Sequence, residues 1–133
     1  MKDLIKKIKK ARFVFVCGNG GSASTAEHLT NDLFSRGIKA ICLNSNTSIM
    51  TMIANDFGYE YVFSKQLQVL ANEEDLLITI SCSGTSKNVV NALFKAKQKG
   101  METYSFKKFG KDRDYETSED EHLQLVHKIK KAL

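Results

Sequence analysis

Two short loops, each directly after a continuous apolar run, constrain the fold of this chain more than any other feature. Residues 17–22 (Cys-Gly-Asn-Gly-Gly-Ser) follow the apolar run 13–16, and residues 81–86 (Ser-Cys-Ser-Gly-Thr-Ser) follow the run 76–80. Continuous apolar runs of this length are typical of parallel strands covered on both faces. Because a segment with helical periodicity follows each loop, the sequence predicts two strand–turn–helix units.

The remaining periodicity alternates in the same way along the chain. Helices are expected over residues 2–10, 22–35, 47–55, 60–71, 86–99 and 118–133, and strands over 12–17, 39–43, 76–80 and 102–106. We expect Thr47 to cap the third helix, and Ser118 with Glu121 to form a capping box for the last one. The polar segment 107–117 is expected to be a loop. Strands that alternate with helices predict an α/β fold, a three-layer αβα sandwich with a parallel, flavodoxin-like sheet of four to five strands. One domain over residues 1–133 is expected.

Composition narrows the function classes. No apolar run approaches the roughly 20 residues that cross a bilayer, and the charged start is unlike a signal peptide. We therefore expect a cytoplasmic protein without a membrane partner. The net charge is +5, and much of the excess lies near the two ends, at Lys6, Lys7, Lys9, Lys10, Lys128, Lys130 and Lys131. Without interleaved aromatic residues these lysines are interpreted as solvated helix faces, not as a nucleic-acid site. The odd number of cysteines, Cys17, Cys42 and Cys82, favours reduced core thiols.

Both loops have the chemistry of a phosphate site. The first backbone N–H groups of a helix lack helical partners and carry partial positive charge, so that helix N-termini bind anions. The hydroxyl groups of the loops would add further donors. They belong to Ser22, Ser81, Ser83, Thr85 and Ser86. Serines at such positions also serve as simple helix caps, but two loops at the carboxyl edge of one sheet favour one shared phosphorylated ligand.

Several segments together resemble a known family. They are residues 17–28, residues 53–58 with 63–66, residues 80–89, and residues 119–122 with His127. In their order and residue identities these segments resemble the motifs of the sugar isomerase (SIS) domain family, and within it those of the phosphoheptose isomerases. The resemblance runs from about residue 12 to 106 and resumes near 118. The resembling enzymes usually have a longer helical region before the first strand, and a glycine-rich turn, a helix and a fifth strand after the position of Phe106.

The resemblance implies a phosphosugar aldose–ketose isomerase that converts sedoheptulose 7-phosphate to glycero-manno-heptose 7-phosphate through an enediol. Asp32 stands where those enzymes carry a glutamate general base, and His127 where they carry the partner acid/base. His28 and Asp32 share a helix face as an i, i+4 pair. The non-catalytic alternatives are that Asp32 is a surface carboxylate and that His127 is an exposed histidine without a role in the reaction. His122 lies about 140° around the helix from His127, so the two cannot face one ligand, and the resemblance favours His127.

The resemblance also implies the binding residues and partners. The substrate residues would be Asn19, Gly20, Gly21, Ser22, Asn55, Asp56, Ser81, Cys82, Ser83, Thr85 and Ser86. Zinc is a candidate cofactor and no other is implied. Its ligands would be His28, Asp32, Glu119 and His127. A homo-oligomer, dimer or tetramer, is expected because the last helix carries an apolar stripe (Leu125, Val126, Ile129, Leu133). The alternative function is a non-catalytic SIS module that binds a phosphosugar or a protein partner.

Overall fold

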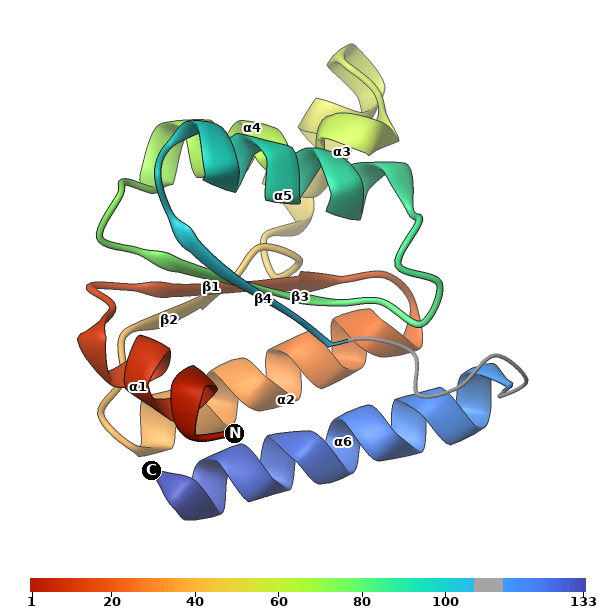
Figure 1. Cartoon of the computed structure of the whole chain (residues 1–133). Coiled ribbons are helices and arrows are strands. Elements are labelled where there is room, and N and C mark those ends of the chain that lie inside the picture. The colour runs from red at the N-terminus through yellow and green to blue at the C-terminus, as the bar shows by residue number, and fades with distance from the viewer. Residues whose placement is uncertain (107–113) are drawn as a thin grey trace.

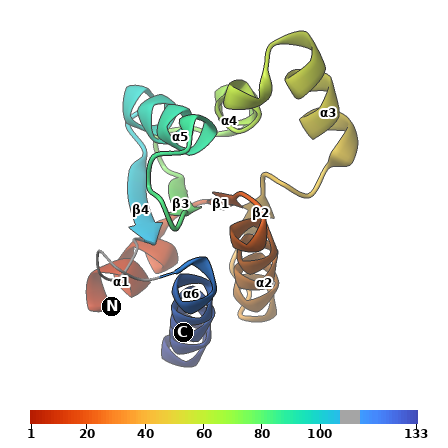
Figure 2. The same ribbon diagram turned by 90° about the vertical axis from the view of Figure 1, so that its right-hand side faces the viewer.

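The computed structural model describes residues 1–106 and 114–133, and within them a parallel sheet lies between two layers of helices (Figures 1 and 2). The elements in chain order are α1 (Lys2–Lys10), β1 (Val14–Gly18), α2 (Gly21–Ser35), β2 (Ala40–Cys42), α3 (Thr47–Asp56), the 3-10 turn η1 (Tyr59–Tyr61), α4 (Ser64–Leu70), β3 (Leu76–Ile80), α5 (Lys87–Gln98), β4 (Glu102–Phe106) and α6 (Tyr115–Ala132). Helices α1, α2 and α6 cover one face, and α3, α4 and α5 the other. The predicted αβα sandwich with a parallel sheet is confirmed.

The sheet separates two hydrophobic cores. Val14 and Val16 of β1 pack toward α1, α2 and α6, whereas Phe15 and Cys17 pack toward α3, α4 and α5. Every residue of β1 and of β3 is buried. Successive side chains of a strand point to opposite faces, so a strand covered on both sides must be apolar throughout. This is the physical reason for the continuous apolar runs in the sequence.

The topology brings the two loops together. The strand order is β2-β1-β3-β4, with all neighbours parallel, so the chain changes direction across the sheet between β1 and β3. Gly18 and Ile80, the last residues of these strands, are paired in register. A Cβ on Gly18 would lie 2.6 Å from the carbonyl oxygen of Ser22 and 2.8 Å from that of Ile80. Only glycine fits where strand β3 and the start of α2 approach so closely.

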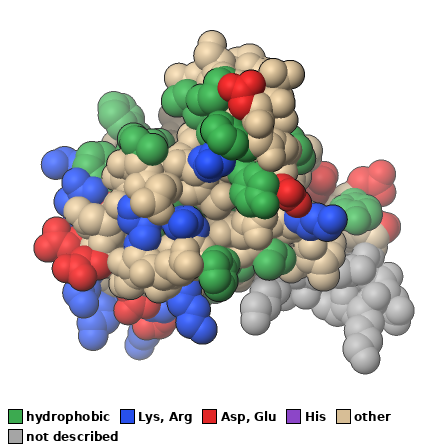
Figure 3. Space-filling model, turned by 90° about the horizontal axis from the view of Figure 1, so that it is seen from above, with side chains coloured by type: hydrophobic (Ala, Val, Ile, Leu, Met, Phe, Trp, Pro, Cys, Tyr) green, Lys and Arg blue, Asp and Glu red, His purple; other side chains and the backbone are tan. Residues whose placement is uncertain are grey.

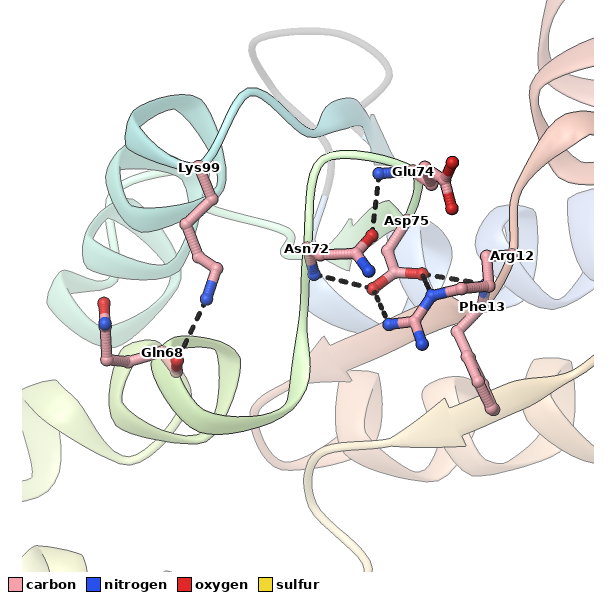
Figure 4. A network of polar contacts seen from close by, with 7 residues as sticks. All are labelled: Arg12, Phe13, Gln68, Asn72, Glu74, Asp75 and Lys99. Carbon is pink, nitrogen blue, oxygen red and sulfur yellow. Dashed lines mark hydrogen bonds and ion pairs between the residues drawn. The ribbon is translucent and has the colours of Figure 1, made fainter.

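A buried carboxylate fixes the opposite edge of the sheet (Figure 4). Asp75, which is 1% exposed, precedes β3 and accepts hydrogen bonds from Arg12 Nε at 3.0 Å and Nη2 at 2.8 Å. It also accepts from the backbone N–H groups of Phe13 at 3.0 Å and Asn72 at 2.8 Å. Because Arg12 and Phe13 lead into β1, this network holds the starts of the two strands whose ends carry the loops.

Three local predictions are wrong. Asn46, not Thr47, caps α3, because its Oδ1 accepts from Ile49 N at 3.0 Å. Helix α6 begins at Tyr115, where Asp114 Oδ1 accepts from Thr117 N at 2.7 Å, so Ser118 lies buried within the helix and does not cap it. The predicted loop 107–117 extends too far, because residues 115–117 belong to α6, and its residues 107–113 lie outside the described residues.

The single helix predicted over residues 60–71 is also wrong. The structure has the short turn η1 followed by α4. Val62, Phe63 and Ser64 are all buried, and one amphipathic helix at the surface does not bury three consecutive residues. The chain therefore turns between the two pieces to place Val62 and Phe63 in the core.

Two compositional expectations can be compared with the structure. None of the described helices is both long and apolar enough to traverse a bilayer. Cys17, Cys42 and Cys82 are all buried, and no disulfide joins them. Burial raises the pKa of the Cys17 and Cys42 thiols, so these two side chains are neutral core residues, as predicted.

Candidate functional site

A cavity of about 330 Å³ lies at the carboxyl edge of the sheet, between the loops that follow β1 and β3. We call this cavity the cradle. Residues of both loops line it, and two residues from the first turns of α6 close it. The lining residues are Asn19, Gly20, Gly21, Ser22, Ile80, Ser81, Cys82, Ser83, Ser86, Tyr115 and Glu119. Of the eleven substrate residues expected from the sequence, the structure brings all but Asn55, Asp56 and Thr85 to the cradle.

The loop after β1 delivers the N-terminus of α2 to the cradle. Gly20 has φ 57°, a left-handed conformation that glycine adopts without strain. Helix α2 begins at Gly21, so its first N–H groups and the positive end of its dipole lie at the cavity. A Cβ on Gly21 would overlap the Glu119 carboxylate, which therefore lies directly against this helix end. A negatively charged group already sits where the dipole favours an anion.

The loop after β3 contributes hydroxyl groups. Ser81 Oγ accepts from Gly84 N at 2.9 Å, and Ser83 Oγ accepts from Thr85 N at 3.2 Å. Ser83 Oγ lies 3.5 Å from the hydroxyl oxygens of both Ser81 and Ser86. Each hydroxyl can accept from a loop N–H and still donate its own hydrogen, so Ser81 and Ser83 can donate to a ligand in exchange for their long contacts with each other and with Ser86. Three hydroxyl groups thus converge on one side of the cradle.

The two loops are joined by a reciprocal pair of amides. Asn19 Nδ2 donates to Asn88 Oδ1 at 2.8 Å, and Asn88 Nδ2 donates to Asn19 Oδ1 at 2.9 Å. The Tyr59 hydroxyl also donates to Asn19 Oδ1, at 3.0 Å. Asn88 is 2% exposed, near the start of α5. The amide of Asn19, expected from the resemblance to bind the sugar, therefore holds the first loop against α5.

Three of the expected substrate residues lie away from the cradle lining. Asn55 and Asp56, at the end of α3, are exposed, and Asn55 Nδ2 donates to Asp56 Oδ1 at 3.0 Å. They also do not line the neighbouring cavity of about 650 Å³ between Asn19, Tyr59 and Lys87. The third, Thr85, lies in the loop after β3 with an exposed side chain.

The expected acid–base residues form a separate cluster between α2 and α6, which lie side by side (Figure 2). His28 Nε2 is 3.4 Å from Asp32 Oδ2, and the His28 and His127 rings are 5.2 Å apart between centroids. Asp32 is only 2% exposed, so it is not a surface carboxylate. Its Oδ1 accepts from Lys130 Nζ at 2.8 Å. We call these four side chains the α2–α6 cluster.

The other histidine of α6 has a different environment. His122 is fully buried, with its ring centroid 5.7 Å from that of Phe106. His127 lies on another side of the helix, toward α2. The spacing argument that these two histidines cannot face one ligand is thus consistent with their positions.

The four candidate zinc ligands do not lie together: three are in the α2–α6 cluster, and Glu119 is at the cradle. Glu119 lies against Gly21, eight residues or about 12 Å along α6 from His127. Among the side chains that the structure describes, no three or more of His, Cys, Asp and Glu are placed to hold a metal ion. Asp32 instead has the Lys130 ammonium as its cation. The described residues, in this arrangement, do not fit a zinc site.

Besides the cradle residues Ile80 and Tyr115, three residues that hold the site together were not predicted from the sequence. Asn88 and Tyr59 reach Asn19 from segments far along the chain, and no local pattern marks such pairs. Lys130 was interpreted as part of a solvated helix face, but it is half-buried and paired with Asp32. The only available signal was its three-residue spacing from His127, which places both on one helix face.

The fold and the cradle define a class: doubly wound α/β domains whose ligand site lies at the carboxyl ends of the strands, where the strand order reverses. Comparison with known proteins then gives the family. The family model described as "SIS domain" matches residues 2–107, and the chain belongs to this family.

Relatives and solved structures agree on the branch that the chain resembles. It is 49% identical to the phosphoheptose isomerase of Helicobacter pylori (strain P12), a match that covers 77% of this chain and 56% of the relative. It is 44% identical to phosphoheptose isomerase 1 of Campylobacter jejuni, over 74% of this chain and 56% of that one. The chain thus spans about half the length of these curated relatives. The structure of the Neisseria gonorrhoeae phosphoheptose isomerase superposes with a TM-score of 0.89 at 28% identity, covering 98% of this chain and 80% of that one.

Proposed function

We propose that this chain is a phosphosugar aldose–ketose isomerase that acts on sedoheptulose 7-phosphate. The observation that carries the proposal is the cradle, in which a helix N-terminus and three serine hydroxyls meet at the switch point of the sheet. The names of the relatives supply the substrate, because the proteins similar to this chain are phosphoheptose isomerases.

In this proposal the phosphate is the handle of the substrate. The N–H groups at the start of α2 and the hydroxyls of Ser81, Ser83 and Ser86 would donate to its oxygens. Binding energy gained at the phosphate would hold the far end of the sugar in place for proton transfer. The Glu119 carboxylate, which now lies against Gly21, would have to move aside for the phosphate.

The acid–base groups lie at a suitable distance for a long substrate. With C–C bonds of about 1.5 Å, an extended seven-carbon chain and its phosphate span roughly 10 Å. His28 is seven residues, or about 10 Å, along α2 from Gly21, and it is 42% exposed. We propose Asp32 and His127 as the acid–base pair, with His28 between them. One group would remove the proton from C1 of the ketose while the other gives a proton to the C2 carbonyl oxygen, which forms the enediol. The aldose would then form when a proton is returned to C2 and the hydroxyl proton on O1 is removed.

We further propose that the enzyme works as a cytoplasmic homo-oligomer. The apolar stripe of α6 supports this less than expected, because Val126 and Ile129 are buried within the chain itself. Better support comes from the α3–α5 face, where hydrophobic side chains are exposed among lysines (Figure 3). Phe57, Val69 and Phe94 there are 54%, 82% and 62% exposed. Light scattering on the purified chain tests this part of the proposal.

The isomerase proposal is tested by incubating the chain with sedoheptulose 7-phosphate in D₂O and recording ¹H NMR spectra. We expect new anomeric proton signals of the aldose and deuterium at its C2. Ser83→Ala should raise the KM, and His127→Asn should lower kcat, while Lys131→Ala, at an exposed position of the same helix as His127, should match the unmodified chain. Phosphosugar binding without turnover would reject the enzyme and favour a non-catalytic SIS module.

A further inference from the structure

Among the described residues two carboxylates are buried, Asp75 and Asp32, and Asp32 lies between two helices. It is 2% exposed, and its partner Lys130 reaches it from α6 across the helix interface. A carboxylate in such a place needs a counter-charge, because an unpaired buried charge is strongly unfavourable. Either a metal ion or a cationic side chain could supply it.

The geometry leaves one side of the carboxylate to a cation, and Lys130 fills it. Lys130 Nζ lies 2.8 Å from Asp32 Oδ1, while Oδ2 faces His28 Nε2 at 3.4 Å. A zinc ion bound to the same oxygen would lie about 2.0–2.2 Å from it. The ammonium would then be in steric and electrostatic conflict with a dication at almost the same position.

We propose that the Lys130 ammonium takes the place of a divalent cation at Asp32. Because this ammonium occupies the position, the α2–α6 cluster does not bind zinc. In this arrangement Lys130 is a positioning residue that orients the carboxylate toward His28. Removal of the ammonium would free the Asp32 carboxylate, and rotation of the neighbouring His28 and His127 side chains would then let three ligands bind one zinc ion. Imidazole and carboxylate ligands suit zinc. The inference does not depend on the isomerase proposal, because zinc content is measured without substrate.

The test is zinc retention. The unmodified chain and its Lys130→Ala variant are dialysed against Zn²⁺, passed over a desalting column, and analysed for zinc per chain by mass spectrometry. Competition with a chromophoric chelator gives the affinity. Lys131→Ala is the matched control, since this lysine is the next residue of α6 but is exposed. The double variant Lys130→Ala/Asp32→Asn shows whether retained zinc is bound at the cluster.

We expect the unmodified chain and Lys131→Ala to retain no zinc that depends on Asp32. Lys130→Ala should bind zinc at least about tenfold more tightly, since like-charge repulsion is removed, and the double variant should lose this gain. Stoichiometric zinc in the unmodified chain that disappears in Asp32→Asn would overturn the proposal. So would a folded Lys130→Ala with unchanged zinc affinity. If Lys130→Ala does not fold, Lys130→Met, which keeps the length of the side chain, replaces it, and the measurement on the unmodified chain still decides.

Discussion

Replacement of Asn88 by alanine should weaken phosphosugar binding although this side chain does not line the cradle. The substitution removes both hydrogen bonds of the amide pair, at 2.8 and 2.9 Å. Each is worth about 1 kcal/mol net, and leaving Asn19 Nδ2 without its partner adds about 1 kcal/mol. Since Tyr59 still bonds Asn19 Oδ1, we expect the free energy of unfolding to fall by about 2–3 kcal/mol.

The same change should reach the ligand through the position of the first loop. Without the amide pair, the loop after β1 would occupy its binding position for only part of the time, and the apparent Kd rises by the inverse of that fraction. If the closed position then lies about 1.4 kcal/mol above the open ones, the loop is closed about one tenth of the time, and the Kd for sedoheptulose 7-phosphate is about tenfold weaker. Isothermal titration calorimetry measures this Kd, and urea unfolding measures the stability.

Asn91→Ala is the matched control. It removes the same side chain one turn along α5, where Nδ2 donates to the Glu60 carbonyl at 3.0 Å and not to a cradle loop. We expect about 1 kcal/mol of destabilisation and an unchanged Kd. If the two variants bind the phosphosugar equally well, the amide pair does not position the loop, and the reasoning is refuted.

Three further predictions concern charge. Glu119→Gln should tighten phosphosugar binding about threefold to tenfold, because it removes an anion beside Gly21; calorimetry giving an equal or weaker affinity would contradict this. Asp75→Ala should cost about 3 kcal/mol in urea unfolding, since four hydrogen bonds are lost, whereas Glu74→Ala, at an exposed position, should cost little. Burial raises the pKa of Cys17, so the folded chain keeps a proton that the unfolded chain releases, and stability should fall as the pH rises above about 8.5; Cys17→Ala should reduce this slope in thermal unfolding.

Much of the fold could be predicted from the sequence because local patterns carry it. Strand β3 and strand β4 begin and end at the predicted residues, since an apolar run between turn residues has little freedom in its bounds. Both cradle loops were located from a local pattern as well: small and hydroxyl-bearing residues directly after a buried strand indicate a turn at the carboxyl edge of the sheet. The caps of α3 and α6 were misplaced because adjacent residues, Asn46 and Thr47 for example, are both good caps and only the backbone geometry selects one.

The sequence by itself thus determined the α/β class, the family and the two loops of the cradle. Only the tertiary structure decided which side chains meet across it. Asn19 and Asn88 are 69 residues apart in the chain, and Asp32 and Lys130 are 98 apart. Such pairs depend on the strand order and on how α2 packs against α6. Periodicity along one helix shows which residues share a face, but the partner that the face meets is set by the fold of the whole chain.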